Sequence, residues 1–478
     1  MTTCGNKEEE IANMTTAEQG QKPWIEALHE ELGDVVSSEP QDLEAHGNDE
    51  GYRYENRPPE CVVYARNKED VVSVLQVARE HAVPVTARGA GSSLEGNALP
   101  VRGGISLDLT RMNRIVSIDP ESMTVTAEAG VRRKELNRRL REHGLFLSVD
   151  PGADATVGGM AGTNASGSNA LEYGSFRDQV LSMEVVLADG RVLRLGTKAR
   201  KSSSGYALGD LFVGSEGTLG IITELTLVVH ALPEVTASAR ALFPDVESAV
   251  EAAVKLVRRG LNLARLEMVD AECIRAVNRY KAADFPEQTT LWVEFHGGSE
   301  DAVAEEIKVA EEICRAVGAQ GDMPVARTPE EYESLWEARH HAWYAVDDYY
   351  EDQQLVSTDT CVPVAKLPEA IGYTQDLMRE YSMIAPVVGH VGDGNFHVFF
   401  HVGPDDAGGW QRLGTVMDGM VRKALELGGT STGEHGVGIR KRKYQELEHG
   451  EALSVMREVK ELFDPLGILN PGKVLPGT

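Results

Sequence analysis

The sequence has few cysteines and no long apolar run, and each shortage excludes a class of protein. Its five cysteines are widely spaced and form no CxxC pair, which argues against disulfides, zinc knuckles and iron–sulfur clusters. The longest apolar candidate, IITELTLVV at 221–229, is only strand-length, whereas a membrane span needs about 20 apolar residues. The sequence therefore predicts neither a disulfide-stapled nor a membrane-spanning protein.

Positive charge, and lysine in particular, is also scarce. The chain carries 75 Asp and Glu against 47 Lys and Arg, which gives a net charge of −28, and only 15 of the basic residues are lysine. Such a field repels nucleic acid and anionic membranes, so neither is the default partner. An acidic, lysine-poor surface fits a high-salt cytoplasm, where screening relieves self-repulsion, but an ordinary acidic protein explains it equally well.

The composition of the N-terminus and the position of one proline suggest how the 478 residues are divided into domains. The N-terminus, MTTCGNKEEEIANMTT, is acidic and lacks the apolar core of a signal peptide, so we expect a cytoplasmic location. Pro233 follows a predicted strand that ends at His230 and marks a break. We predict three parts, namely a lead-in over 1–56 with a short helix near Trp24–Leu32, a domain over 57–234 and a domain over 235–478.

Strand and helix patterns alternate in both larger parts. In the first, the predicted strands, helices and hairpin cover 61–65, 69–81 (a helix that Asn67 could cap), 83–87, 104–109, 114–129 and 131–142. In the second, strands at 237–243, 263–269 and 290–296 alternate with helices at 246–259 (with Asp245 as cap) and 299–317. The second pattern predicts an antiparallel sheet covered by helices on one face.

Three glycine-rich loops lie in the first part, and the first of them follows a predicted strand. They are ARGAGSSLEGN (87–97), PGADATVGGMAGTNASGSNALEYGS (151–175) and VGSEGTLGIITELTL (213–227). Small residues let the backbone approach a ligand closely, and successive N–H groups can hold an anion. The first loop is neither a Walker loop nor a GxGxxG helix start. A single loop of this kind could be an ordinary surface loop, but the first two, flanking one sheet, could hold both halves of a long dinucleotide.

Histidines and one carboxylate gather in the glycine-rich stretches of the second part. In GHVGDGNFH (389–397), Asp393-Gly394 is a preferred two-residue turn, which would pair His390 with His397 across a hairpin. Glu434 follows in TGEHGVG (432–438). Two histidines and a carboxylate suit Zn²⁺ or Mn²⁺, although two stacked histidines in a turn would give the same pattern. His401, on the same strand face, is more simply a strand residue than a fourth ligand.

These motifs together resemble known flavoproteins. The three loops resemble the FAD-binding domain of the vanillyl-alcohol oxidase (PCMH-type) family. GHVGDGNFH, TGEHGVG and LNPGKVL (469–475) resemble the C-terminal half of FAD-linked D-2-hydroxyacid dehydrogenases, a branch that includes cytochrome-type D-lactate dehydrogenases and glycolate oxidase D subunits. The resemblance implies an α+β chain with a two-subdomain PCMH-type FAD-binding domain. It also implies a C-terminal α+β substrate domain whose antiparallel sheet is covered by helices.

The resemblance implies a set of residues for FAD, with the first loop on the pyrophosphate, the second on pyrophosphate, ribitol and ring edge, and the third along adenine and ring. They are Arg88, Gly89, Ala90, Gly91, Ser92, Ser93, Leu94, Glu95, Gly96, Pro151, Gly152, Ala153, Thr156, Gly158, Gly159, Gly162, Asn164, Ser166, Gly167, Tyr173, Gly174, Glu216, Gly217, Gly220, Ile221, Ile222 and Asn470. Neither of the first two loops contains the His or Cys that tethers FAD in many relatives, so we expect non-covalent FAD.

The resemblance also implies the chemistry. His390, His397 and Glu434 would hold the metal, and His435 would act as general base, a role that suits imidazole near neutral pH. Arg339, in the helical stretch LWEARHHAWYA (335–345), would hold the substrate carboxylate, although its spacing also fits a surface arginine on a core helix. Relatives that take dicarboxylates carry a Lys where 354–363 has none, which favours a small monocarboxylate.

The expected reaction is oxidation of a D-2-hydroxy acid, with D-lactate to pyruvate favoured over glycolate or D-2-hydroxyglutarate, by hydride transfer to flavin N5. The sequence contains no CxxCH haem site, so electrons must pass to an external acceptor such as a cytochrome, a quinone or an electron-transfer flavoprotein. An alkyl-transferring flavoprotein of the same fold and a flavin-binding subunit without catalysis are the alternatives, and the metal trio speaks against both. The resemblance leaves open a homodimer and contact with the inner face of a membrane.

Overall fold

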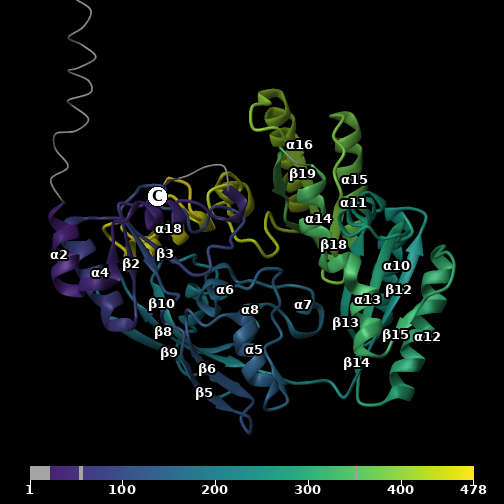
Figure 1. Cartoon of the computed structure of the whole chain (residues 1–478), viewed down its shortest axis with the longest axis horizontal. Helices are drawn as coiled ribbons and strands as arrows, with labels where there is room; N and C mark the ends of the chain where they lie inside the picture. Colours follow the sequence, from purple (N-terminus) through teal and green to yellow (C-terminus); the bar gives the residue numbers. More distant parts are fainter. Residues whose placement is uncertain (1–21, 53–56, 351, 478) are drawn as a thin grey trace, which may run out of the picture.

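The computed structural model describes residues 22–52, 57–350 and 352–477. Two bodies lie side by side (Figure 1), the N-terminal one built on two sheets and the C-terminal one on a single eight-stranded sheet. The acidic N-terminus, Cys4 and the rest of 1–21 lie outside the described residues. Among the described helices, none is long and apolar enough to cross a membrane. The described cysteines are all free, as expected.

The first sheet has the order β1-β2-β4-β3. Its strands are β1 (Val36–Ser37), β2 (Cys61–Tyr64), β4 (Ile105–Asp108) and β3 (Val85–Arg88). Helix α4 (Lys68–His81) connects β2 to β3 and begins as predicted, because the Asn67 side chain accepts a hydrogen bond from the Asp70 N–H at 3.0 Å. The predicted lead-in helix is α2 (Pro23–Leu32), and its apolar face packs into the core of this sheet.

The second sheet is antiparallel, with the order β5-β6-β10-β8-β9. Its strands are β5 (Ile115–Asp119), β6 (Thr124–Glu128), β10 (Ile221–Val228), β8 (Val180–Val186) and β9 (Val192–Gly196). The predicted hairpin is β5–β6, and the predicted helix after it is α5 (Arg133–Arg141). Shorter elements complete this body: β7 (Leu145–Phe146), α6 (Val157–Thr163), α7 (Ala170–Tyr173), α8 (Phe176–Gln179), α9 (Gly209–Phe212) and β11 (His230–Ala231).

The C-terminal sheet runs β15-β12-β14-β13-β18-β19-β16, with β17 also paired to β19, and its pairs are antiparallel as predicted. Its strands are β12 (Val235–Phe243), β13 (Leu263–Val269), β14 (Thr289–Gly297), β15 (Val325–Ala326), β16 (Gln354–Ser357), β17 (Thr360–Cys361), β18 (Val387–His390) and β19 (Asn395–Val402). The sequence alone predicted the strands at 237–243, 263–269 and 290–296 to within two residues.

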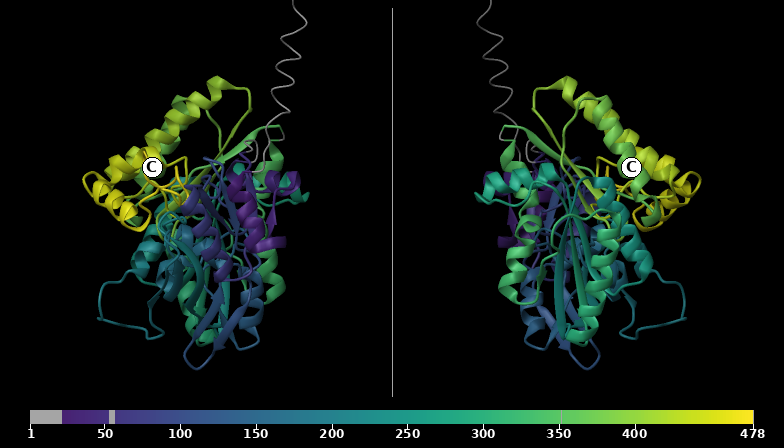
Figure 2. Two further views of the ribbon diagram at one scale, coloured as in Figure 1. Left: turned by 90° about the vertical axis from the view of Figure 1, so that its left-hand side faces the viewer. Right: turned by 90° about the vertical axis from the view of Figure 1, so that its right-hand side faces the viewer.

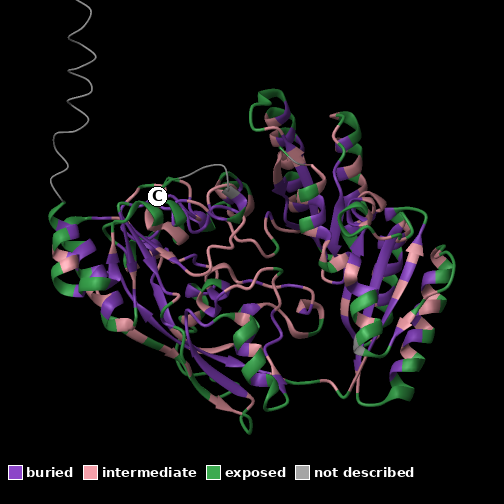
Figure 3. Cartoon of the chain, viewed as in Figure 1, coloured by how far each residue is buried: buried purple, intermediate pink, exposed green. Residues whose placement is uncertain are grey.

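Helices cover both faces of this sheet, not one (Figure 3). One face packs against α10 (Val246–Arg259), α12 (Glu300–Val317), α15 (Leu367–Glu380) and α16 (Ala407–Glu426). The other packs against α11 (Ala271–Lys281), α13 (Pro329–His340) and α14 (Ala342–Tyr349). The reason lies in β14, where Trp292 and Val293 point to opposite faces and both are fully buried. A strand buried on both sides reads as a continuous apolar run.

The chain returns to the N-terminal body at its end (Figures 1 and 2). Leu469 forms a parallel bridge with Val85 on β3, and its side chain lies in the core of the first sheet. In α18 (Ala452–Phe463), buried Lys460 donates to the Thr218 carbonyl at 2.7 Å. Residues beyond the predicted boundary at 234 therefore complete the N-terminal body.

Candidate active site

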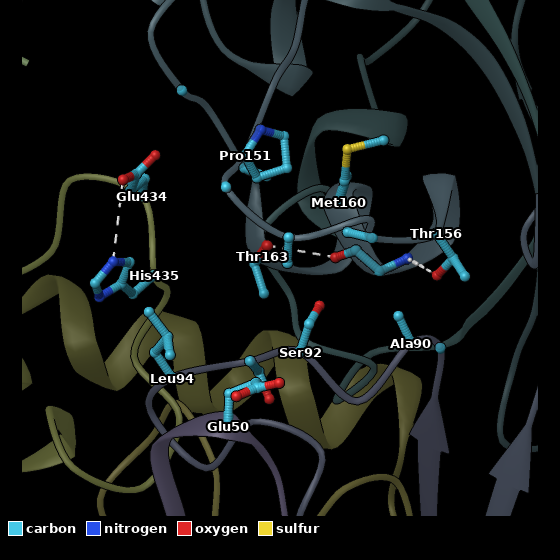
Figure 4. Close-up of a pocket in the computed structure, with 18 of the residues that line it drawn as sticks. Glu50, Ala90, Ser92, Leu94, Pro151, Thr156, Met160, Thr163, Glu434 and His435 are labelled. Carbon is cyan, nitrogen blue, oxygen red and sulfur yellow. Dashed lines mark hydrogen bonds and ion pairs between the residues drawn. The ribbon is translucent and has the colours of Figure 1, made fainter. Parts of the chain in front are cut away.

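A cavity of about 810 Å³ lies between the two bodies (Figure 4). The N-terminal body contributes the three glycine-rich loops. The C-terminal body contributes α13 and α14, β18 and β19, and the loop that carries Glu434 and His435. Segments far apart in the sequence thus form one continuous wall.

Most of the predicted cofactor residues line this cavity. They are Arg88, Gly89, Ala90, Gly91, Ser92, Ser93, Leu94, Pro151, Gly152, Ala153, Thr156, Gly158, Gly159, Gly162, Gly167, Glu216, Gly217, Gly220, Ile221 and Ile222. At Gly89 a side chain would meet Thr156 Oγ1 at 2.2 Å, so glycine is needed there for the first two loops to close on each other. A cavity whose wall contains many Gly, Ala and Ser residues lets a dinucleotide such as FAD lie close to the main chain.

Seven predicted cofactor residues lie outside the cavity wall: Glu95, Gly96, Asn164, Ser166, Tyr173, Gly174 and Asn470. Several of them brace the loops instead. Asn164 ends α6 with a positive φ of 51° and accepts from the Arg177 N–H at 2.9 Å. Gly174 lies beside the capping box of α8, and Gly96 makes a turn at φ 75°.

Tyr173 and Ser166 contact the C-terminal body, and Asn470 fixes the returning end of the chain to the N-terminal body. The Tyr173 hydroxyl lies 3.1 Å from His296 Nδ1, and Ser166 Oγ donates to Glu434 at 3.2 Å. Asn470 Nδ2 donates to the carbonyls of Asn97 (3.0 Å) and Glu216 (2.7 Å). Their positions indicate that they hold the wall together rather than form its surface.

His390, His397 and Glu434 converge on one point of the wall. Glu434 Oε1 lies 3.3 Å from His390 Nε2 and 3.2 Å from His397 Nε2. The predicted two-residue turn is wrong: β18 and β19 are joined by four residues, and His390 pairs with Asn395 rather than His397. The two rings nonetheless meet with centroids 5.5 Å apart, because His397 is the diagonal neighbour on the same face.

The outer nitrogens of both rings are occupied. His390 Nδ1 lies 2.6 Å from Glu267 Oε1, and His397 Nδ1 lies 2.8 Å from the Thr358 carbonyl. Carboxylate and carbonyl oxygens only accept, so each Nδ1 carries a proton and each Nε2 faces Glu434 Oε1. Either a proton or a metal ion fits between these nitrogens and Glu434, and this outer-partner arrangement is typical of metal-binding histidines.

The pKa values of His390 and Glu434 are shifted in opposite directions by the groups around them. Burial opposes a charge on His390, but Glu267 and Glu434 outweigh it and raise its pKa well above the ordinary value. Burial opposes a charge on Glu434 too, yet His390 and His397 hold the pKa of that carboxyl well below its usual range. The site is therefore built for a positive charge between ionised groups.

Asp359 holds the loop that carries Glu434 and His435. Its carboxylate accepts the backbone N–H groups of Gly433 (2.9 Å) and His435 (2.9 Å) and pairs with Lys441 Nζ at 3.1 Å. Asp359, His397 and His435 lie close enough to suggest a second metal triad. The oxygens of Asp359 are already committed to these donors, so its role is to shape the loop.

Arg339 reaches the cavity from the C-terminal end of α13. Its Nε and Nη2 lie 2.9 and 2.8 Å from Glu267 Oε2, the same carboxylate that holds His390. The helix predicted over 335–345 breaks at His341, so Arg339 lies at a helix end and not within a continuous helix. His401 contacts no member of the trio and instead stacks on Tyr350, with centroids 4.1 Å apart.

The sequence reasoning missed Glu267, Asp359 and Arg265. An acidic residue inside the apolar strand β13 was a usable signal for Glu267, because buried carboxylates need partners. Arg265, two residues earlier, lines the cavity and pairs with Asp150 (3.3 Å) and Glu294 (3.7 Å). No local pattern marks Asp359.

Comparison with known proteins agrees with this architecture. A family model for the FAD binding domain matches residues 59–196, and one for the C-terminal domain of FAD linked oxidases matches residues 232–474. A probable mitochondrial D-lactate dehydrogenase of Danio rerio is 42% identical over 436 residues, which cover 90% of this chain and 87% of that protein. A glycolate oxidase subunit of Bacillus subtilis is 34% identical over 433 residues, covering 88% and 91%.

Solved structures share the fold. Substrate-bound p-cresol methylhydroxylase superposes with a TM-score of 0.75 at 18% identity, covering 96% of this chain and 98% of that one. An alkyldihydroxyacetonephosphate synthase gives a TM-score of 0.73 at 21% identity, covering 94% and 85%. Fold and cavity thus define a two-domain flavoprotein with a PCMH-type FAD-binding domain. The chain belongs to the FAD-linked oxidase family, so it is an FAD-dependent oxidoreductase.

Proposed function

We propose that this protein oxidises a D-2-hydroxy acid, with D-lactate to pyruvate as the favoured reaction, and passes the electrons to an external acceptor. The observation that carries the proposal is the meeting of His390, His397, Glu434, His435 and Arg339 at one part of the cavity wall. The names of the D-lactate dehydrogenases among its relatives support the same reaction. When bound, FAD supplies the hydride acceptor.

The metal trio and the base divide the work on the substrate hydroxyl. A divalent ion, Zn²⁺ or Mn²⁺, held by His390, His397 and Glu434 would lower the pKa of that hydroxyl. His435 lies beside the trio, with Nε2 4.0 Å from Glu434 Oε1, and would accept the hydroxyl proton. Its fixed place next to the trio removes much of the orientation cost of the step.

Arg339 would bind the substrate carboxylate. Its contacts with Glu267 use Nε and Nη2, which leaves Nη1 for the substrate. Arg265, the second arginine that the C-terminal body adds to the wall, already pairs with Asp150 and Glu294. The positive charge of Arg265 is therefore already balanced by these carboxylates. This, together with the absence of lysine in 354–363, favours a monocarboxylate over a dicarboxylate such as D-2-hydroxyglutarate.

The test is anaerobic mixing of the FAD-loaded protein with D-lactate, L-lactate, glycolate and D-2-hydroxyglutarate, with flavin bleaching followed by absorbance. D-lactate should bleach the flavin fastest, and L-lactate should not bleach it. A protein that bleaches with none of them has another activity, of which alkyl transfer is the first to try. A dye or cytochrome should then reoxidise the flavin, because the sequence has no haem motif. The cytoplasmic location, homodimer and membrane contact remain predictions.

A further inference from the structure

Glu95 belongs to the first glycine-rich loop but faces the C-terminal chain rather than the cavity. Glu95 is fully buried, and its backbone carbonyl accepts the Ile439 N–H at 2.8 Å. Its carboxylate Oε1 lies 3.4 Å from His435 Nδ1 and 3.3 Å from Lys441 Nζ. The side chain therefore contacts the loop that carries the base, not the wall that would hold the flavin.

The remaining contacts of His435 fix its backbone and its ring plane. Its N–H donates to Asp359 at 2.9 Å, and its carbonyl accepts from Asn97 Nδ2 at 3.2 Å. Its ring stacks on His397 with centroids 5.0 Å apart and planes 11° apart. What these contacts leave undetermined is which ring nitrogen carries the proton, and Glu95 is the carboxylate that faces Nδ1.

Glu95 is placed to keep its negative charge. Lys441 Nζ lies between Glu95 and Asp359, and Arg440 Nε lies 3.8 Å from the second oxygen of Glu95. Burial alone would raise the pKa of Glu95, but Lys441 and His435 outweigh it and lower the pKa below its ordinary value. An ionised carboxylate at Nδ1 stabilises the tautomer that has its proton there.

We propose that Glu95 is the positioning residue of His435: it holds the proton on Nδ1, so that the lone pair of Nε2 faces the substrate hydroxyl. This inference rests on the proposed function. In the reaction the hydroxyl proton moves to Nε2, and the hydrogen on C2 leaves with its electron pair for the flavin. Glu95 takes no proton; it stabilises the imidazolium that forms, as the carboxylate does in a Ser-His-Asp triad.

The test is a double-mutant cycle on the FAD- and metal-loaded protein, with Glu95→Gln, His435→Ala and the double variant. Glu184→Gln is the matched control, since Glu184 is a buried carboxylate of the same body that pairs with Lys68 at 3.2 Å and lies off the cavity. FAD content, metal content and melting temperature are measured first. The rate of flavin reduction by D-lactate is then followed by stopped flow over a range of substrate concentrations.

Glu95→Gln should keep FAD and metal and slow reduction at saturating substrate by roughly 10²–10⁴-fold, with the half-saturating concentration nearly unchanged. The double variant should be no slower than His435→Ala alone, because Glu95 acts only through His435. Glu184→Gln should reduce its flavin at the wild-type rate.

Other results would show whether the role of Glu95 or the role of His435 is wrong. Losses that multiply in the double variant would mean a general structural role and would overturn the inference. Loss of FAD from Glu95→Gln would place Glu95 in the flavin site and overturn it too. A wild-type rate in His435→Ala would instead remove the base from the proposed function. Where Glu95→Gln does not fold, the same cycle with Glu95→Asp applies, since Asp keeps the charge beside Lys441 but draws it back from Nδ1.

Discussion

Replacing Glu267 with Gln should disturb the metal and the substrate at the same time. Glu267 uses one oxygen for His390 Nδ1 at 2.6 Å and the other for Arg339 at 2.8 Å, and its side chain is 1% exposed. A carboxylate accepts on both oxygens, whereas an amide accepts on one and donates on the other. In either orientation, Gln therefore turns an N–H toward one of two donors and leaves that donor buried without a partner.

The size of the effect follows from that unmet donor. An unsatisfied buried polar group costs about 1–3 kcal/mol, and each 1.4 kcal/mol is tenfold in an equilibrium constant. We therefore expect metal affinity, the KM for D-lactate, or both to worsen by about 10–100-fold in Glu267→Gln. The range matches the effect of removing outer partners of metal-bound histidines.

Metal titration of the stripped protein and steady-state kinetics measure the two quantities separately. Glu184→Gln is again the control, because Glu184 is a buried carboxylate that pairs with Lys68 at 3.2 Å and lies off the cavity. Wild-type metal affinity together with wild-type KM in Glu267→Gln would refute the reasoning.

Four further outcomes are expected. Acid should release all FAD from the polypeptide, since the first two loops offer no tethering His or Cys, and flavin that stays with the denatured chain on a gel would contradict this. Melting temperature should rise from low to molar KCl because of the net charge of −28; a flat or falling curve would favour the ordinary acidic protein. His397→Ala should lose metal and turnover but keep FAD, as metal analysis and absorbance will show. Loss of FAD as well would mean that the glycine-rich loops depend on the metal trio. Burial disfavours a charge on His296, but hydrogen bonds to Glu172 and Glu294 raise its pKa to about 9, so its contribution to stability is complete below about pH 6.5 and is lost as pH rises through 9. The wild-type melting temperature should fall over that window, while His296→Gln should show a flatter curve.

Short sequence patterns, such as helix caps and turn residues, predicted the helices and hairpins that they specify. The N-caps at Asn67 and Asp245 placed the starts of α4 and α10, because each side chain satisfies a free N–H of the first turn. The β5–β6 hairpin followed from its turn residues. The glycine-rich loops pointed to the cavity, since close approach of backbones needs small residues wherever the fold brings them together.

The predictions that failed depend on contacts between segments far apart in the sequence, which no local pattern marks. Glu267 and His390 are separated by 123 residues, so only the pairing of β13 with β18 brings them together. The hairpin register shifted because the preferred Asp393-Gly394 turn gave way to a four-residue connection, with Gly394 at φ 92° packed under the Val362 carbonyl. Glu95 looked like a cofactor residue because its neighbours belong to the first glycine-rich loop, and only the returning C-terminal chain reveals its other partners.

The bridge between Val85 and Leu469 has a consequence for synthesis of the chain. β3 is the edge of the first sheet, and its Val85 N–H and carbonyl are paired at 2.8 Å with Ile468 and Asn470, which leave the ribosome long after β3 itself. Until then the flavin-binding body presents an unpaired edge, which is a template for wrong association. A nascent chain stalled or cleaved after residue 234 should therefore depend on chaperones, even though all three glycine-rich loops are already made.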